Sequence, residues 1–376
     1  MKAQPTILLL AGEASGDHHA AGVARALRAR LPGVRLVGTG GPLMAEEGVE
    51  LLAGLDDLAV MGFVEVVRHL RFFRRLMKRV VGLLEAGEVD LVIPVDYPGF
   101  NLRVTQAAHR RGIPVLYYIA PQVWAWKPGR ARRLARQADH VAVILPFEVE
   151  ILRAVGADVS FVGHPLLEHT GDLPDRTSFC SRWGLDPTRP LLALLPGSRR
   201  QELDRHLELF QAAARHVRAR YAEVQPVLAR ATSVPESWLE EAEVPVVDET
   251  RALLRHARAA LVKSGTSTLE AALAGVPFVM AYRTHPLTYR MAVRLVRVPH
   301  IALANLVAGA PIVPEVLQDA ATADRLAALL TPLVGDSPAR ERQLAGLERV
   351  RGALGSPGAS GRVAAKAISL LERSKR

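Results

Sequence analysis

The sequence has little from which covalent cross-links or a membrane span could be built. Cys180 is its only cysteine, which excludes a disulfide within the chain and a cluster of thiolate ligands, and suits a reducing cytoplasm. No apolar run reaches the roughly 18 residues that a membrane-spanning helix needs. The opening segment, MKAQPTILLLAGE, has too short an apolar run for a signal peptide, so we expect none. We therefore predict a cytoplasmic protein that does not cross a membrane.

Acidic residues are outnumbered by basic ones. The chain has 48 Lys and Arg against 38 Asp and Glu, a net charge of +10. A surplus of this size favours a polyanionic partner: nucleic acid, an acidic membrane surface or phosphorylated substrates. The arginines are dispersed over predicted helices, and no RNP, zinc or basic-region motif accompanies them. Nucleic acid is therefore the partner we do not expect.

The 376 residues exceed the usual size of a single core. Apolar runs alternate with helical patterns twice, on either side of the polar segment LLEHTGDLPDRTSFCSRWGLDPTRP. Such alternation implies parallel sheets with helices on both faces. We predict an α/β protein of two Rossmann-like domains facing a cleft, residues 1–168 and 169–345. A helical tail at 346–376 would pack back on the first domain or on a partner subunit. Ligands should lie at the carboxyl ends of the strands.

The first predicted βα turn, in LLLAGEASGDHHAAGV (residues 8–23), carries charged residues where a dinucleotide motif has glycines. Gly12 and Gly16 permit a tight turn, and Ser15 or Asp17 is placed to cap the following helix. Because the glycine spacing differs from the dinucleotide motif, a nicotinamide cofactor is not expected. Carboxylates at a strand end repel phosphate but accept hydrogen bonds from hydroxyls. The segment is either a simple capped turn or a site where Glu13 and Asp17 hold sugar hydroxyls.

Asp96, in PVDYPGFNLR (residues 94–103), follows another buried strand. One interpretation is the N-terminal region of a helix, with Asn101 as its cap. The other is a general base, since a carboxyl group in a partly closed cleft can have a raised pKa and accept a proton from a hydroxyl. Glu13 and His18 in the opening turn are the alternatives for this base.

Two tryptophans stand among polar residues in APQVWAWKPGRARRLAR (residues 120–136). Trp124 and Trp126 are either core residues or part of a strand-end loop with Gln122 and Lys127. Aromatic rings beside cations suit sugar faces and phosphates.

The second half contains two turns that favour anion binding. In LLPGSRRQE (194–202), Gly197 and Ser198 place backbone N–H groups at a helix start, and Arg199 adds a cation. In KSGTSTLEAALAGVP (263–277), Gly265 opens a similar helix and Glu270 lies in its first turn, placed to bind ribose hydroxyls. Each turn alone is a common pattern, but together they fit a nucleotide diphosphate.

The segment VEVVRHLRFFRRLMKRVVGLL (residues 64–84) predicts a basic amphipathic helix. Six cations lie within residues 68–79 without an acid among them, beside an apolar stripe that Phe72 and Leu76 widen. The helix either packs its stripe on the sheet or docks on anionic lipid headgroups. The residues assigned to membrane contact are Val66, Val67, Leu70, Arg71, Phe72, Phe73, Arg74, Arg75 and Leu76.

Eight segments together resemble one known family. AGEASGD, MGFVEV, DYPGFNLR, YYIAPQVWAW, LPFE, FVGHP, LLPGSR and SGTSTLEAAL occur in this order, from Leu8 to Gln318 by motif. They resemble lipid-A-disaccharide synthases, the glycosyltransferases of lipid A assembly in Gram-negative bacteria. One difference is Ala304, where the family usually has proline before the asparagine; Asn305 is in place.

The resemblance implies a GT-B fold, no cofactor and no metal. The sequence agrees on the metal, because no Asp-x-Asp pair occurs that could hold a diphosphate-bound cation. The implied reaction joins UDP-2,3-diacylglucosamine to 2,3-diacylglucosamine 1-phosphate, forming a β(1→6) disaccharide with inversion and releasing UDP. It also implies peripheral association with the inner face of the inner membrane and a possible homodimer. A UDP-sugar epimerase is the rival, since it would share the fold and the nucleotide turns.

The residue assignments combine pattern and resemblance. Asp96 is the expected catalytic base, with Glu13 and His18 beside it. Substrate or nucleotide binding is assigned to Ser15, Asp17, Gln122, Trp124, Gly197, Ser198, Arg199, Glu202, Gly265, Thr266, Ser267, Glu270, Asn305 and Gln318.

Overall fold

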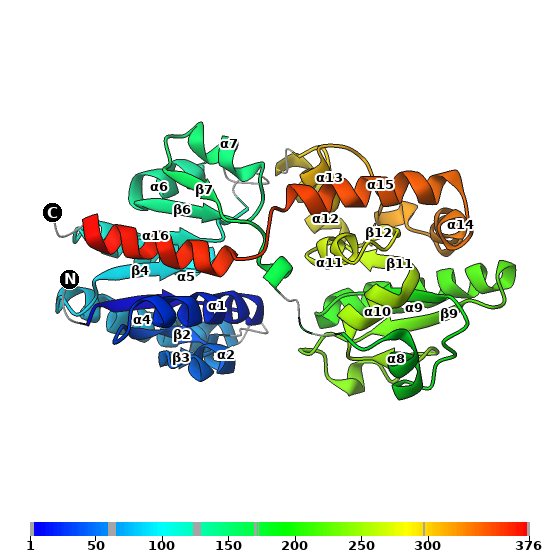
Figure 1. The fold of residues 1–376 in the computed structure, drawn as a ribbon, viewed down its shortest axis with the longest axis horizontal. Helices are drawn as coiled ribbons and strands as arrows, with labels where there is room; N and C mark the ends of the chain where they lie inside the picture. The colour runs from blue at the N-terminus through cyan, green and yellow to red at the C-terminus, as the bar shows by residue number, and fades with distance from the viewer. Residues whose placement is uncertain are drawn as a thin grey trace. The chain divides into compact units, whose positions relative to one another are not determined.

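A computed structural model describes residues 4–58, 65–122, 129–168, 171, 173–295 and 298–373, without the side chains of residues 65–70, 287, 291, 292, 294 and 295. The chain divides into two compact units. Unit 1 comprises Met1–His169 and Gly355–Arg376, and unit 2 comprises Thr170–Leu354. The chain therefore enters unit 2 once and returns to unit 1 for its last helix, which is red in Figure 1.

Unit 1 alternates strands and helices along the chain. Its elements are β1 (Thr6–Leu10), α1 (Ala14–Arg30), β2 (Arg35–Gly40), α2 (Pro42–Glu46), β3 (Glu50–Gly54), α3 (Leu55–Leu58), α4 (Glu65–Glu85), β4 (Leu91–Pro94), α5 (Pro98–His109), β5 (Leu116–Tyr118), α6 (Gly129–Gln137), β6 (His140–Val143), α7 (Glu148–Arg153), β7 (Val159–Phe161), the 3-10 turn η1 (Pro165–Glu168) and α16 (Ala359–Arg373).

Unit 2 repeats the alternation. Its elements are α8 (Arg176–Arg182), β8 (Leu191–Leu195), α9 (Arg200–Arg220), β9 (Gln225–Ala229), η2 (Glu236–Trp238), β10 (Val246–Val247), α10 (Thr250–His256), β11 (Ala257–Lys263), α11 (Ser267–Leu273), β12 (Phe278–Tyr282), α12 (Pro286–Leu295), α13 (Leu303–Ala308), β13 (Glu315–Leu317), η3 (Gln318–Ala320), α14 (Ala323–Val334) and α15 (Pro338–Ala353).

Both units are built on parallel sheets, as the alternation predicts. In the described part of unit 1 the strand order is β3-β2-β1-β4, and isolated bridges from Val92 to Val115 and from Val95 to Tyr118 continue it into β5-β6-β7. Unit 2 has the order β10-β9-β8-β11-β12-β13. The order reverses direction between β1 and β4 in unit 1 and between β8 and β11 in unit 2. Loops diverge at the carboxyl ends of such strand pairs, and ligands bind in the space they leave.

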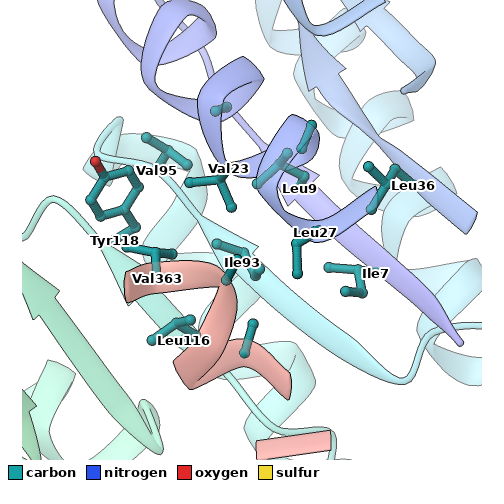
Figure 2. Packing of buried hydrophobic residues seen from close by; sticks show 14 of the residues in the cluster. Ile7, Leu9, Val23, Leu27, Leu36, Ile93, Val95, Leu116, Tyr118 and Val363 are labelled. Atoms are coloured by element: carbon teal, nitrogen blue, oxygen red, sulfur yellow. The ribbon is translucent and has the colours of Figure 1, made fainter. Parts of the chain in front are cut away.

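Strand β1 shows why these segments are apolar throughout. All its residues are buried, because helices cover both faces of the sheet. Ile7 and Leu9 face one core, which contains residues of α1 and α16, whereas Leu8 and Leu10 face another, which contains residues of α4 and α5. Figure 2 shows the first core, where Val363 of α16 packs among strand residues.

Helix α16 contacts α1 and is fixed at its start by Glu168, the last residue of η1. The Glu168 carboxylate accepts hydrogen bonds from the backbone N–H and the hydroxyl of Ser360, at 2.7 and 2.6 Å. Arg362 donates to the carbonyl of Val162 at 2.8 Å. Unit 1 therefore needs the last part of the chain to complete its core.

No helix in the described ranges is both long and apolar enough to cross a bilayer.

Candidate active site

Asp96 is the second residue after β4, at the point where the strand order of unit 1 reverses. The turn after β1 lies beside it. A β-carbon on Gly12 would come within 2.4 Å of the Tyr97 ring, so only glycine lets the two loops approach this closely. Glu13, exposed at the start of α1, acts electrostatically on Asp96. Asp96, the predicted base, therefore lies close to Glu13, which is the first of the two alternative bases.

The backbone of Asp96 is held in an unusual conformation. Asp96 and Tyr97 have φ angles of 47° and 46°, in the left-handed region that non-glycine residues rarely adopt. The carbonyl of Asp96 accepts hydrogen bonds from the Tyr117 hydroxyl and from the Asn101 side-chain amide, both at 2.8 Å. Asn101 also donates to the carbonyls of Leu10 and Val95, each at 3.2 Å. The expectation that Asn101 caps α5 is wrong: it lies inside the helix and ties together carbonyls where β1 and β4 part.

Asp96 is poised to accept a proton near neutral pH. Burial raises the pKa of its carboxyl to about 6, the charge of Glu13 adds to the increase, and the backbone N–H of Tyr97 opposes it. A carboxylate with this pKa is ionised at pH 7 and is more basic than an ordinary aspartate. These are the properties that general base catalysis requires.

The opening turn differs from the expectation at Asp17. Its side chain is only 2% exposed, and its carboxylate accepts hydrogen bonds from the backbone N–H groups of Gly41, Leu43 and Met44 at 2.7, 3.2 and 3.1 Å. Asp17 therefore caps α2 rather than α1, and it is not placed to bind sugar hydroxyls.

Ser15 and His18 are exposed on the first turns of α1, as Gln122 is at the end of the described loop after β5. Ser15 makes no capping hydrogen bond, because α1 already begins at Ala14. Trp124 lies outside the described residues.

The corresponding reversal in unit 2 contains both predicted anion-binding turns. Gly197, after β8, has a φ of 130°, and Gly265, after β11, has a φ of 141°. Side chains other than glycine rarely adopt such angles, so the glycines set the shape of both turns. Arg199 lies at the first turn with its side chain 72% exposed. In the second turn Thr266 is exposed and Ser267 begins α11.

A carboxylate of the protein itself joins these turns. Glu202 accepts hydrogen bonds from the Lys263 ammonium at 2.6 Å and from the backbone N–H of Ser198 at 3.1 Å. Burial alone would raise the pKa of Glu202, but its hydrogen bond with Lys263 and the charge of that residue lower it overall. Arg199 is also within 3.9 Å of the Glu202 carboxylate. Two of the groups predicted to bind a phosphate, the N–H of Ser198 and the Arg199 side chain, therefore lie at an internal anion, Glu202.

Glu270 is mostly buried in the first turn of α11. Burial raises the pKa of its carboxyl, and the charge of Arg251 partly offsets this. A carboxyl group with a raised pKa at this position remains compatible with binding vicinal hydroxyls.

Two other assigned residues make their hydrogen bonds within the fold. Asn305 is fully buried: its amide nitrogen donates to Val313 and Glu315, and its amide oxygen accepts from the N–H of Val313. Gln318 pairs through both ends of its amide with the backbone of Thr284, at 2.7 and 3.0 Å. Asn305 therefore shapes the loop before β13, and Gln318 fixes the loop after β12. The expectation that they bind substrate directly does not match these contacts.

His206 is a functional candidate that the sequence does not single out. It is fully buried, its Nδ1 lies 2.7 Å from the carbonyl oxygen of Glu202, and its Nε2 accepts a hydrogen bond from the N–H of Arg283 at 2.9 Å. One nitrogen donates and the other accepts, so the neutral ring fits these partners. Burial lowers its pKa to about 4, and Lys263 contributes to this. In the sequence, the only signal at Lys263 is its place: it ends a predicted strand and precedes a Gly-Thr-Ser-Thr turn.

Helix α4 uses most of its apolar face in the core. Leu76, Val80 and Leu84, spaced by one turn, are at most 4% exposed. The expectation that Leu76 widens an exposed apolar surface is therefore wrong, because its side chain packs in the core with the sheet. Phe72 and Phe73 are partly buried against the same core.

The basic face of α4 is exposed at Arg71, Arg74, Arg75 and Lys78. The side chains of Val66, Val67 and Leu70 lie outside the described residues.

No group of three or more His, Cys, Asp or Glu side chains in the described ranges is arranged to hold a metal ion.

The two parallel α/β units define a GT-B protein, and the solved structures that resemble the chain agree. A calicheamicin glycosyltransferase aligns with a TM-score of 0.63 at 18% identity, covering 99% of both chains. A UDP-GlcNAc 2-epimerase from Neisseria meningitidis, bound to UDP-GlcNAc, aligns with the same TM-score at 13% identity, covering 98% of this chain and all of the other. At these identities the likeness confirms the predicted GT-B fold.

Sequence comparison identifies the family. A sequence model of the family described as lipid-A-disaccharide synthetase matches residues 7–359. The lipid-A-disaccharide synthase of Geobacter sulfurreducens is 40% identical over 97% of both chains, and that of Syntrophus aciditrophicus is 41% identical over 98% of both. The chain belongs to the lipid-A-disaccharide synthase family, and it is a glycosyltransferase of lipid A biosynthesis. The resemblance stated from its motifs is confirmed.

The buried His206 predicts a loss of stability in acid. Its pKa is about 4 in the folded chain and about 6.5 when exposed, so the unfolded chain binds the proton first as the pH falls. Its contribution is intact above pH 6.5 and decreases by about 2–3 kcal/mol as the pH falls toward 4. Asp96, with its raised pKa, acts in the opposite direction over the same range.

Comparing the parent with His206→Gln isolates this effect, because glutamine does not titrate. We expect the parent to lose more unfolding free energy than the variant between pH 6.5 and 4, measured by urea unfolding at several pH values. Parallel pH dependence of the two proteins would show that His206 is not held neutral.

Proposed function

We propose that the chain transfers 2,3-diacylglucosamine from UDP to the 6-hydroxyl of 2,3-diacylglucosamine 1-phosphate, with inversion and without a bound metal. The observation that carries this proposal is Asp96, a partly buried carboxyl group with a raised pKa where the strand order of unit 1 reverses. Family membership supplies the substrates, and the site supplies a route for the proton.

The proposed reaction is a single displacement. Asp96 accepts the proton of the acceptor 6-hydroxyl as its oxygen attacks the anomeric carbon. The bond from that carbon to the diphosphate oxygen breaks, and its electron pair leaves with UDP. One displacement inverts the configuration, so an α-linked donor gives a β-linked product. Glu13, next to Asp96, supports the basicity of the carboxylate through its charge.

Stabilisation of the leaving diphosphate is assigned to unit 2. The Gly197–Arg199 and Gly265–Ser267 turns would supply backbone N–H groups, and Arg199 and Lys263 would supply positive charge. The Glu202 carboxylate accepts hydrogen bonds from Lys263 and from the N–H of Ser198. A bound diphosphate would share these donors with Glu202. Glu270, at the start of α11, is assigned to the ribose.

Contact with an anionic membrane surface is assigned to the exposed basic face of α4, formed by Arg71, Arg74, Arg75 and Lys78. The acyl chains of both substrates must come from a bilayer, and the chain has no spanning helix among its described residues. Since Leu76 and its neighbours pack in the core, we assign the attraction mainly to charge. The proposal places the protein on the inner face of the inner membrane.

Removing the proton acceptor tests the chemistry. Asp96→Asn should retain its fold and UDP affinity while kcat falls roughly 10²–10⁴-fold, the usual scale for loss of a general base. Disaccharide formation is measured by mass spectrometry, with Asp56→Asn, which changes an exposed acid of the same unit, as the control. Turnover of Asp96→Asn within a few-fold of the parent would assign the proton to another group, with Glu13 tested next.

Removing the exposed cation tests the nucleotide site. Arg199→Ala should weaken UDP binding by about 1.5–3 kcal/mol, as expected for a hydrogen bond to a charged group. Arg200→Ala is the matched control, because Arg200 is the next residue and pairs with Asp204 at 2.9 Å. Titration calorimetry measures both. Equal UDP affinities in the two variants would remove Arg199 from the site.

Removing the charges of α4 tests the membrane contact. Replacing Arg71, Arg74, Arg75 and Lys78 by serine should weaken co-sedimentation with anionic vesicles and reduce activity on long-chain substrates, with UDP binding intact. Added salt should weaken the binding of the parent, because exposed charge interactions are screened.

The control removes four exposed cations of unit 2, with serine at Arg325, Arg342, Arg349 and Arg351. It loses the same charge, so a general effect of net charge would affect both variants alike. If the α4 variant binds vesicles as well as this control does, α4 is only a structural helix.

A further inference from the structure

The loop that carries Asp96 needs support from elsewhere in the fold. Asp96 and Tyr97 both have φ near +46°, and two successive non-glycine residues in this region are unfavourable without outside constraints. The Asp96 N–H donates to the carbonyl of Tyr118 at 3.0 Å, which fixes the peptide group before Asp96. The peptide group after Asp96 depends on the contacts of the Asp96 carbonyl.

The Tyr117 hydroxyl supplies that contact. Tyr117 lies on β5, next to β4, and its side chain is fully buried. Its hydroxyl donates to the Asp96 carbonyl at 2.8 Å, alongside the Asn101 amide at the same distance. The contact is with the peptide and not with the carboxylate, so Tyr117 influences where the carboxylate lies without competing for its proton.

We propose that Tyr117 is a positioning residue for the reaction: its hydroxyl keeps the Asp96 peptide in the left-handed conformation that holds the carboxyl group beside Glu13. The inference rests on the proposed role of Asp96 as base. Without this hydrogen bond, the Asp96 carbonyl keeps only the hydrogen bond donated by the Asn101 side-chain amide. The Asp96 backbone can then relax toward the extended region.

The charged surroundings agree with such a role. Glu13, in the turn after β1, acts electrostatically on the Asp96 carboxyl, and Arg130 of α6 influences the ionisation of Tyr117. Burial and the charge of Asp96 both raise the pKa of Tyr117, so its hydroxyl stays protonated and able to donate. Relaxation of the loop would change the exposure of Asp96 and its separation from Glu13. These two factors raise its pKa.

Tyr118 provides an unusually close control. It is the next residue on the same strand and is equally buried, but its hydroxyl has no hydrogen-bond partner among the described residues. Tyr117→Phe and Tyr118→Phe therefore remove the same atom from neighbouring buried sites. Each phenylalanine keeps the ring that fills its site, and thermal unfolding checks that both variants fold.

The experiment compares pH profiles of kcat for the parent and both variants, using UDP-2,3-diacylglucosamine and the acceptor 1-phosphate. Tyr117→Phe should lower kcat by about 10–100-fold, the scale for a misplaced catalytic group, with KM for the UDP-sugar within a few-fold of the parent. The acidic limb of its profile should move to lower pH, because a more exposed Asp96 has a lower pKa. Tyr118→Phe should match the parent in both respects. The position of the limb does not depend on how much enzyme is folded.

An unchanged kcat and an unchanged acidic limb in Tyr117→Phe would overturn the proposal, as would equal effects of the two substitutions. Asp96→Asn, assayed in parallel, distinguishes failure of the positioning role of Tyr117 from failure of the assignment of Asp96 as base. If that variant is inactive and Tyr117→Phe is normal, only the positioning role fails. If Asp96→Asn is fully active, the base assignment fails and the positioning role fails with it.

Discussion

Where the strand order of unit 1 reverses, side chains donate hydrogen bonds to the backbone carbonyls at the ends of β1 and β4. The side-chain amide of Asn101 meets the carbonyls of Leu10, Val95 and Asp96, and the Tyr117 hydroxyl meets the last of these again. Buried carbonyls left unsatisfied would be costly, so these contacts determine how the chain leaves β4. The left-handed backbone of Asp96, its partial burial and its raised pKa all depend on the path that the chain takes after β4.

At the corresponding reversal of strand order in unit 2, the contacts are made by charged side chains. Glycines at 197 and 265 shape the turns after β8 and β11, and the Glu202 carboxylate lies between their donors, bonded to Lys263 and to the N–H of Ser198. His206, neutral because it is buried, connects α9 to the loop after β12 through Arg283. The donors near these two turns are therefore held in place by a carboxylate of the chain itself.

The fold and the outline of the site could be predicted from local patterns. Buried strands such as β1 are apolar throughout, and glycines mark the turns at their ends, so the parallel sheets and the position of Asp96 follow. Partners far apart in sequence could not be predicted. Asp17 is as suited to sugar hydroxyls as to the N–H groups of α2, and Asn305 is as suited to a ligand as to the loop before β13. Which partner each binds depends on tertiary contacts. The face of α4 that carries Leu76 was misassigned for the same reason, because periodicity does not show which side meets the sheet.

The account depends most directly on the product formed. The decisive measurement incubates the purified chain with UDP-2,3-diacylglucosamine and 2,3-diacylglucosamine 1-phosphate in the presence of EDTA, and identifies the products by mass spectrometry and NMR. We expect UDP and a disaccharide 1-phosphate whose new linkage is β(1→6), formed at the same rate as without EDTA. An α linkage, a dependence on metal, or conversion of the UDP-sugar without any disaccharide would contradict the proposed single displacement by the acceptor hydroxyl with Asp96 as its base.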